Sequence, residues 1–205
     1  MAELRELVAT TGRVPYQQLL ALLRTCSPTE FTRQAKHPLL VGHKLYQGEL
    51  VPRQTMKTGT MRFNIVQIQE EMARQKLALE EARNEEPAAA SQEDSVAQAI
   101  FVLRKKLPSK TLPNIFTIGR ASENDIVIAD YAVSKAHAHV TVSFNSYTIT
   151  DLSSTNGTTI ENQPVQPNTP AQLAAGTTIR FGRLGFVFMR PVDLYTALMA
   201  KLHPA

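Results

Sequence analysis

Five polar residues in the second half of the chain have the chemistry to hold a phosphorylated ligand: Arg120, Ser134, Lys135, Thr155 and Asn156. A phosphate monoester carries nearly two negative charges and three strong acceptor oxygens. A guanidinium can hold two of those oxygens at once, and an ammonium adds a point charge. The two hydroxyls can donate hydrogen bonds, and the asparagine amide both donates and accepts, which suits the main chain of an extended peptide. Residues of these types can bind a phosphate group and the main chain of an extended peptide.

The five residues belong to short pieces of sequence whose order and spacing are specific. A single piece such as Gly-Arg is common by chance, so the signal comes from all of the pieces in order. They are Gly119-Arg120, Asn124-Asp125-Ile126, Val133 to Ala138, Asp151 to Thr158, and Gly176 to Gly182. Over roughly residues 98–190, just under half of the chain, this arrangement resembles the forkhead-associated (FHA) domain family.

The resemblance implies a fold and a set of roles. The fold is an antiparallel β-sandwich whose loops at one end bind a phosphothreonine peptide, with the five polar residues as ligand contacts. Three further residues would support the site: Gly119, His137 and Gly157. His137 would hydrogen-bond across the loops and hold the Ser134 segment in place. Gly157 would adopt a backbone angle that other residues rarely reach.

The resemblance also implies a binding protein without enzymatic activity or a cofactor. Its partner would be a threonine-phosphorylated protein, either a Ser/Thr kinase or the substrate of one, and neither a nucleic acid nor a membrane. The alternative is a protein interaction or assembly module on the same fold that ignores phosphate. Arg120, Ser134 and Asn156 argue against that alternative, because a purely structural role needs none of them.

A hydrolase is a third class of function that the residues bring to mind, with Ser134, His137 and Asp151 as a catalytic triad. The sequence lacks the G-x-S-x-G turn that exposes such a serine, and Ser134 and His137 are only three positions apart. We therefore expect no catalysis from these residues. The sequence also lacks a phosphate-binding P-loop and an H-E-x-x-H metal motif.

Composition and charge fit an ordinary globular protein with an anionic ligand. The net charge is +4, and residues 98–190 hold nine Lys/Arg against five Asp/Glu, while the rest of the chain is balanced at thirteen each. The positive excess therefore lies in the region that resembles an FHA domain. The single cysteine, the absence of a long apolar run and an N-terminal stretch unlike a signal peptide predict a cytoplasmic location.

The elements that must position these residues differ between the two halves of the chain. Residues 1–86 read as a mainly helical region of unknown role. Residues 16–25 predict one helix, and Ser27 followed by Pro28 predicts the capped start of a second helix that ends near residue 36. The apolar residues 39–41 are too few to assign. Residues 66–86 predict an exposed amphipathic helix, and residues 87–95 predict a polar linker.

Residues 96–190 predict the sandwich. Short runs rich in β-branched and aromatic residues alternate there with turn formers, as in an antiparallel sandwich. The predicted strands cover residues 99–103, 115–118, 126–128, 138–142, 147–149, 177–181 and 185–189. Residues 191–205 predict a short C-terminal helix. The expected fold is thus β-dominated, with helices at both ends of the chain.

Overall fold

Two β-sheets form the centre of the protein. The computed structural model describes residues 3–45, 96–107, 111–144 and 146–202, and these residues belong to one compact unit of the chain. The larger sheet has seven strands in the order β1-β3-β2-β12-β11-β8-β9, and each neighbouring pair is antiparallel. In chain order these strands are β1 (Arg13–Val14), β2 (Leu39–Leu45), β3 (Ile100–Val102), β8 (Thr158–Ile160), β9 (Gln163–Pro164), β11 (Thr178–Phe181) and β12 (Leu184–Met189).

The smaller sheet has five strands in the order β10-β7-β6-β4-β5. Strands β4 and β5 pair in parallel, and the other neighbours in this sheet pair antiparallel. The strands are β4 (Ile115–Gly119), β5 (Ile126–Val127), β6 (Ala138–Ser143), β7 (Ser146–Asp151) and β10 (Ala171–Leu173). The predicted β-dominated sandwich is confirmed, and each of the seven predicted strands overlaps a strand of the structure.

The sandwich core consists of side chains that the strands alternately point inward. In β4, for example, Phe116 and Ile118 are buried while Thr117 between them is half-buried. Its buried side chains include Phe116, Ile118, Val140, Ile149, Phe181, Phe186 and Phe188. Burying each such side chain stabilises the fold by about 1.5–3 kcal/mol. This core fixes the strand ends, and the strand ends carry the loops that hold the predicted site.

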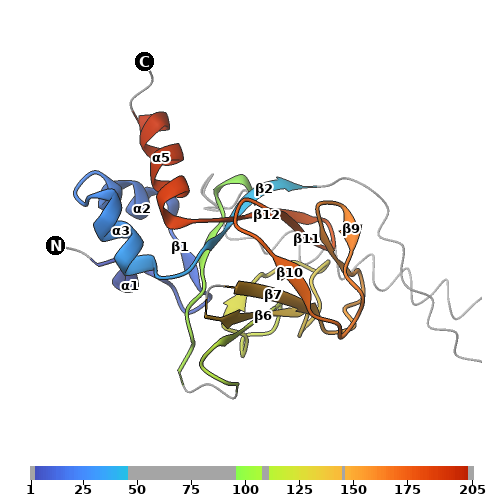
Figure 1. Ribbon diagram of the computed structural model, residues 1–205. Coiled ribbons are helices and arrows are strands. Elements are labelled where there is room, and N and C mark those ends of the chain that lie inside the picture. The colour runs from blue at the N-terminus through green and yellow to red at the C-terminus, as the bar shows by residue number, and fades with distance from the viewer. Residues whose placement is uncertain (1–2, 46–95, 108–110, 145, 203–205) are drawn as a thin grey trace, which may run out of the picture. The chain divides into compact units, whose positions relative to one another are not determined.

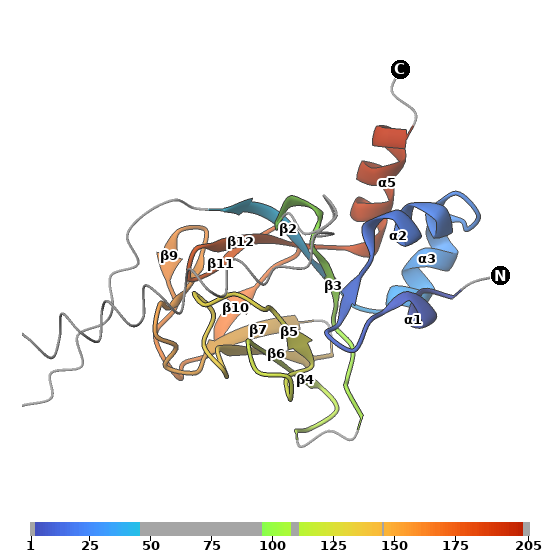
Figure 2. The same ribbon diagram turned by 180° about the vertical axis from the view of Figure 1, so that it is seen from behind.

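Helices gather at one end of the sandwich in both views (Figures 1 and 2). They are α1 (Leu4–Leu7), α2 (Tyr16–Leu23), α3 (Pro28–Ala35) and α5 (Pro191–Leu202), and a short 3₁₀ turn, η2 (Val96–Gln98), precedes β3. The two predicted N-terminal helices and the C-terminal helix are confirmed. Ser27 caps α3 as expected, because its hydroxyl accepts a hydrogen bond from the Glu30 N–H at 3.2 Å.

A second apolar cluster joins these helices to the larger sheet. Leu19 and Phe31, from α2 and α3, pack with Leu194 and Leu198 of α5. The Tyr195 hydroxyl donates a hydrogen bond to the carbonyl of Cys26 at 2.9 Å. The helical end is therefore packed onto the sandwich rather than tethered to it.

Strand β2 shows that the N-terminal region contributes to the sandwich. It lies between β3 and β12 and pairs with both, so a sandwich that starts at residue 96 leaves out a central strand of the larger sheet. Gly42 interrupts the apolar pattern of this strand, so the sequence did not predict it. A Cβ at that position would overlap the Val96 carbonyl, and the register shifts between Gly185 and Phe186 of the partner strand.

The other strands absent from the sequence prediction are β1, β8, β9 and β10, which have two or three residues each. Segments this short show no periodicity that could be read from the sequence. The predicted amphipathic helix at 66–86 and the predicted linker at 87–95 lie outside the described residues.

Candidate functional site

Three loops meet at the end of the sandwich opposite to α5. Strand β12 shows the polarity: it begins at Leu184, beside the turn that hydrogen-bonds Gly157, and it ends at Met189, just before α5. The loops follow β4, precede β6, and connect β7 to β8. The structure brings all five predicted contact residues to this end.

The Ser134 hydroxyl joins two of these loops. Its Oγ accepts a hydrogen bond from the Thr155 N–H at 2.9 Å and lies 3.3 Å from the Thr155 hydroxyl. The backbone N–H of Arg120 donates to the carbonyl of Ser134 at 2.9 Å, which ties the third loop to the same residue. Ser134 is half-buried and Thr155 is exposed, so both hydroxyls remain within reach of a ligand.

Two cations belong to the loops that meet at Ser134. Arg120 is exposed, and its Nε donates to the carbonyl of Val133 at 3.1 Å, which orients the guanidinium. Among the described residues, the two terminal nitrogens of Arg120 and the ammonium of Lys135 have no partner. The arrangement therefore offers a planar fork and a point charge to an anion.

His137 holds the Ser134 loop and the Gly157 loop together through its buried ring. It is fully buried, its Nδ1 accepts the Ser134 N–H at 3.0 Å, and its Nε2 lies 3.3 Å from the Gly157 carbonyl. Since Nδ1 accepts, the proton sits on Nε2 and is donated to Gly157. Burial lowers the pKa of His137, and the opposing effects of Asp151 and of the Gly157 hydrogen bond are smaller. His137 is therefore neutral near pH 7.

Asn156 and Gly157 shape the loop that carries Thr155. The Asn156 Nδ2 donates to the carbonyl of Ala132 at 2.9 Å, which leaves its amide oxygen available. Gly157 has φ +73°, while a Cβ on it would meet nothing within 4 Å. The requirement for glycine here is therefore conformational and not steric.

Gly119 is required for the opposite reason. A Cβ at Gly119 would overlap the Lys135 carbonyl and would lie 2.7 Å from Nδ2 of Asn124. Asn124 is buried, and its Nδ2 donates to the carbonyls of Ala121 at 2.8 Å and Lys135 at 2.7 Å. Asn124 belongs to the sequence pattern, but the pattern does not indicate this role of holding two loops together.

Asp151 is a second buried support. Its carboxylate accepts hydrogen bonds from the Ser154 N–H at 2.9 Å, the Ser154 hydroxyl at 2.6 Å and the Thr158 hydroxyl at 2.6 Å. Burial raises the pKa of Asp151, but these hydrogen bonds outweigh it and hold the pKa below its ordinary value. A charged Asp151 therefore anchors the loop between β7 and β8.

These bonds also remove the geometry of a catalytic triad. Both ring nitrogens of His137 are engaged by backbone groups, so neither faces the Ser134 hydroxyl as a base. The Asp151 carboxylate is engaged by Ser154 and Thr158. Within the described residues, moreover, no three His, Cys, Asp or Glu side chains lie close enough to hold a metal ion.

Sequence reasoning assigned no role to Arg183, which braces the loop before β6. Its guanidinium pairs with the Asp130 carboxylate at 2.9 Å and stacks on the Tyr131 ring at 4.2 Å from the centroid. Asp130 also accepts the Ala132 N–H at 2.8 Å. Asp130 and Arg183 are 53 positions apart, and no motif links them.

Comparison with known proteins places residues 116–182 in a family. These residues match the family model described as FHA domain. This chain contains an FHA domain. The matched residues run from the middle of β4 to the turn after β11, and they include all the predicted contact residues.

Curated relatives share this part of the chain. The glycogen accumulation regulator GarA of Mycobacterium tuberculosis is 33% identical over 75 residues, which is 37% of this chain and 44% of GarA. The oxoglutarate dehydrogenase inhibitor of Corynebacterium efficiens is 32% identical over 73 residues, which is 36% of this chain and 49% of that protein. The chain thus spans less than half the length of the curated relatives it matches.

Solved structures with similarity include EmbR of Mycobacterium tuberculosis in complex with a low affinity phosphopeptide. It is 31% identical with a TM-score of 0.36, and the match covers 38% of this chain and 20% of EmbR. The FHA domain of FhaA, solved in complex with the intracellular domain of another protein, is 31% identical with a TM-score of 0.38. That match covers 46% of this chain and 91% of the FhaA domain.

Proposed function

We propose that this protein binds threonine-phosphorylated segments of other proteins through its FHA domain and acts as an adaptor in Ser/Thr kinase signalling. The observation that carries the proposal is the geometry around Ser134. Its hydroxyl accepts the Thr155 N–H, and its carbonyl accepts the backbone N–H of Arg120, whose terminal side-chain nitrogens have no partner among the described residues. A phosphate bound there would contact two cations and two hydroxyls. The loops that carry these groups are already ordered by hydrogen bonds, so binding would cost little conformational entropy.

Each contact residue has a distinct part in this proposal. Arg120 and Lys135 neutralise the phosphate, and Ser134 and Thr155 donate hydrogen bonds to its oxygens. The free amide oxygen of Asn156 accepts an N–H from the main chain of the bound peptide, while its Nδ2 stays on Ala132. Phosphate contacts thus supply affinity, and the asparagine sets the direction of the peptide.

The partner is proposed to be a Ser/Thr kinase or a substrate of one. Two relatives are named for control of metabolism, one as a regulator of glycogen accumulation and one as an inhibitor of oxoglutarate dehydrogenase. EmbR was solved with a phosphopeptide. These names support a regulatory protein that binds its partners and does not transform them. None of the helices that the structure describes is both long and apolar enough to cross a membrane.

The experiment that tests this function is binding of the full chain to an oriented phosphothreonine peptide library. Matched phosphoserine and unphosphorylated libraries are the controls. We expect selection of phosphothreonine peptides, and the enriched flanking residues will point to the partner. Binding that ignores phosphate, by a protein shown to be folded, would contradict the proposal and favour an interaction module that is independent of phosphate.

A further inference from the structure

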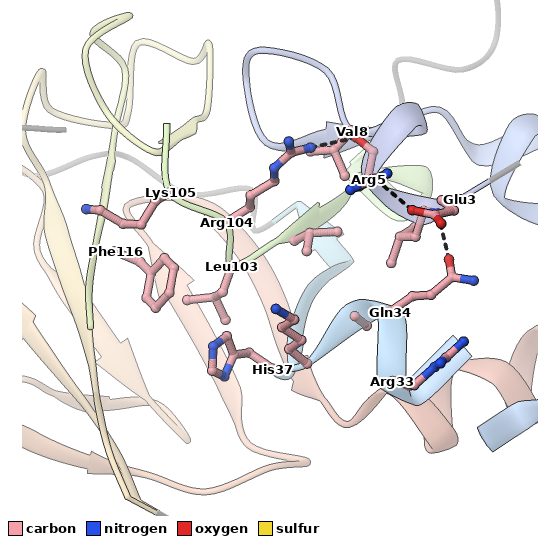
Figure 3. A pocket seen from close by; sticks show the side chains of 14 residues that line it. Glu3, Arg5, Val8, Arg33, Gln34, His37, Leu103, Arg104, Lys105 and Phe116 are labelled. Atoms are coloured by element: carbon pink, nitrogen blue, oxygen red, sulfur yellow. Dashed lines mark hydrogen bonds and ion pairs between the residues drawn. The ribbon is translucent and has the colours of Figure 1, made fainter. Parts of the chain in front are cut away.

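A cavity of about 450 Å³ opens at the helical end of the protein (Figure 3). Helices α1 and α3 form one wall, and the connection from β3 to β4 forms the other. Its apolar lining consists of Leu4, Val8, Ala35, Val102, Leu103 and Phe116. Cavities of this size and lining are typical of sites for small molecules.

The charges around this cavity are mostly positive. Two of its cations are already neutralised, since Arg5 pairs with Glu3 at 2.6 Å and Lys105 pairs with Asp125 at 2.8 Å. Three cations remain: Arg33, Lys36 and Arg104. No carboxylate of the described residues pairs with any of them.

Arg104 is fixed at the upper edge of the cavity. Its Nη1 donates to the carbonyl of Arg5 at 2.6 Å, and this bond joins the β3–β4 connection to α1 (Figure 3). The bond uses one donor of the guanidinium and neutralises none of its charge. Arg104 is exposed, and its charge, which no carboxylate of the described residues neutralises, can attract an anion to the cavity.

Lys36 reaches the cavity from a strained backbone. It has φ 62° and ψ −46°, and the His37 N–H bonds to the Ala35 carbonyl across it at 2.7 Å. This is the classic γ-turn, which is rare and costs free energy for any residue with a Cβ. Glycine would relieve the strain, yet the chain places a lysine there whose side chain lines the cavity.

We propose that this cavity binds a small organic polyanion, with two or more phosphate or carboxylate groups attached to a partly apolar body. Arg33, Lys36 and Arg104 would hold the anionic groups, and the apolar lining would cover the rest of the ligand. A compact ligand fits a cavity closed on two sides by packed elements better than an extended acidic peptide does. The proposal is independent of phosphothreonine binding.

The new site is separate from the loops that hold Ser134. Strand β4 runs from Phe116, in the cavity, to Gly119, beside the loops, and three residues of strand span about 10 Å. The two sites therefore share a strand but no residue. A ligand in the cavity would leave Arg120 and Ser134 accessible.

His37 offers a built-in reporter of occupancy. Its ring contacts Phe116 at 5.5 Å and Tyr147 at 6.4 Å between centroids, and it lines the cavity. A bound anion changes the electric field at this ring, so its NMR signals should shift with ligand concentration.

The test uses the full chain with Arg120→Ala, which is expected to weaken phosphate binding at the loop site about a hundredfold. Inorganic pyrophosphate, citrate and ADP are titrated up to about 10 mM by calorimetry and by NMR of His37. We expect at least one of the three to bind with one-to-one stoichiometry and to shift the His37 signals. Failure of all three to bind would overturn the proposal.

Variants locate the binding. Lys36→Gly, added to the Arg120→Ala chain, should weaken the affinity for the anion at least about tenfold while its Tm stays equal or rises, because glycine relieves the γ-turn. Arg24→Ala, which removes an exposed cation outside the cavity, is the matched control and should change the affinity less than about twofold. Equal affinities in the Lys36→Gly and control chains would contradict the assignment. Binding of a hexaglutamate peptide in place of all three small anions would also contradict it, in favour of an acidic protein segment.

Discussion

The two ends of the sandwich present cations in different ways. At the loop end, Arg120 is oriented by a backbone carbonyl, and the loops beneath it are held by the buried side chains Asn124, His137 and Asp151. At the helical end, Arg33 and Lys36 extend from a short helix and its C-terminal turn. A buried polar scaffold, more than the number of cations, thus distinguishes the proposed phosphate site from the basic cavity.

The loops at the loop end are carried by a sandwich that the N-terminal region completes with strand β2. Removing residues 1–45 deletes β2, which lies between β3 and β12 and carries the fully buried Leu39 and Leu40. We expect the remaining chain to lose its cooperative fold and all phosphopeptide binding. Dispersion of amide NMR signals and calorimetry measure the two losses.

A matched deletion provides the control for this prediction. Replacing residues 54–92 with a Gly/Ser linker removes none of the described residues, so we expect the fold and the binding to persist. If the chain without residues 1–45 folded and bound phosphopeptide, the loop end would not depend on the N-terminal region, and this prediction would be wrong.

Ser134→Ala tests whether the scaffold matters as much as the cations. The change removes the acceptor of the Thr155 N–H and a donor to the ligand. We expect phosphopeptide affinity to fall about tenfold, which is about 1.4 kcal/mol. Fluorescence anisotropy with a labelled phosphopeptide measures the loss, and Ser143→Ala, on an exposed residue at the far end of β6, is the control. An effect no larger than that of the control would mean that the cations act alone.

Acidification tests the buried histidine at the loop end. Burial lowers the pKa of His137 in the folded state, so between its folded and unfolded pKa values the unfolded chain binds more protons. The contribution to stability is complete above the unfolded pKa, about 6.5, and it is lost as the pH falls below that value. We expect the free energy of unfolding in urea to decrease from pH 7 to pH 5.

His37 and His139 have pKa values lowered by burial as well, and they contribute in the same direction. The His137→Asn chain should therefore show a smaller decrease in stability than the wild type but not a flat profile. A profile identical to that of the wild type would mean that His137 takes up its proton equally well in both states.

Arg183→Ala is expected to loosen one loop of the site without removing any proposed phosphate contact. The change removes the ion pair with Asp130 and the stacking on Tyr131. Since these residues are partly exposed, we expect only about a threefold loss of phosphopeptide affinity, mainly through a faster dissociation rate. Surface plasmon resonance separates the two rates, and a change confined to the association rate would instead indicate direct electrostatic attraction of the peptide.

The residues at the loop end could be predicted from the sequence because they lie in short pieces with fixed spacing. The pattern identified the residues that meet around Ser134, and β-branched runs identified seven of the strands. Strand β2 was not predicted because Gly42 and two polar residues interrupt its apolar pattern. Its place in the sheet depends on pairing with β3 and β12, which lie more than 50 residues away.

The helical end could not be predicted for a related reason. Arg33, Lys36 and Arg104 line one cavity only because α1 and α3 pack against the β3–β4 connection. Their spacing in the chain carries no motif. The strained turn at Lys36 is equally invisible, because the sequence there contains no glycine or asparagine that would predict a positive φ.

The most direct test of the central claim is calorimetry of the full chain with one library-selected peptide in three forms: phosphothreonine, phosphoserine and unphosphorylated. The wild type and Arg120→Ala are compared. We predict that the phosphothreonine form binds tightest, that the phosphoserine form, which lacks the threonine methyl, binds more weakly by about 1 kcal/mol, and that the unphosphorylated form does not bind. Arg120→Ala should weaken the phosphothreonine complex about a hundredfold, because a bidentate charged contact is lost. Equal binding of the three forms, or unchanged affinity in Arg120→Ala, would contradict the account.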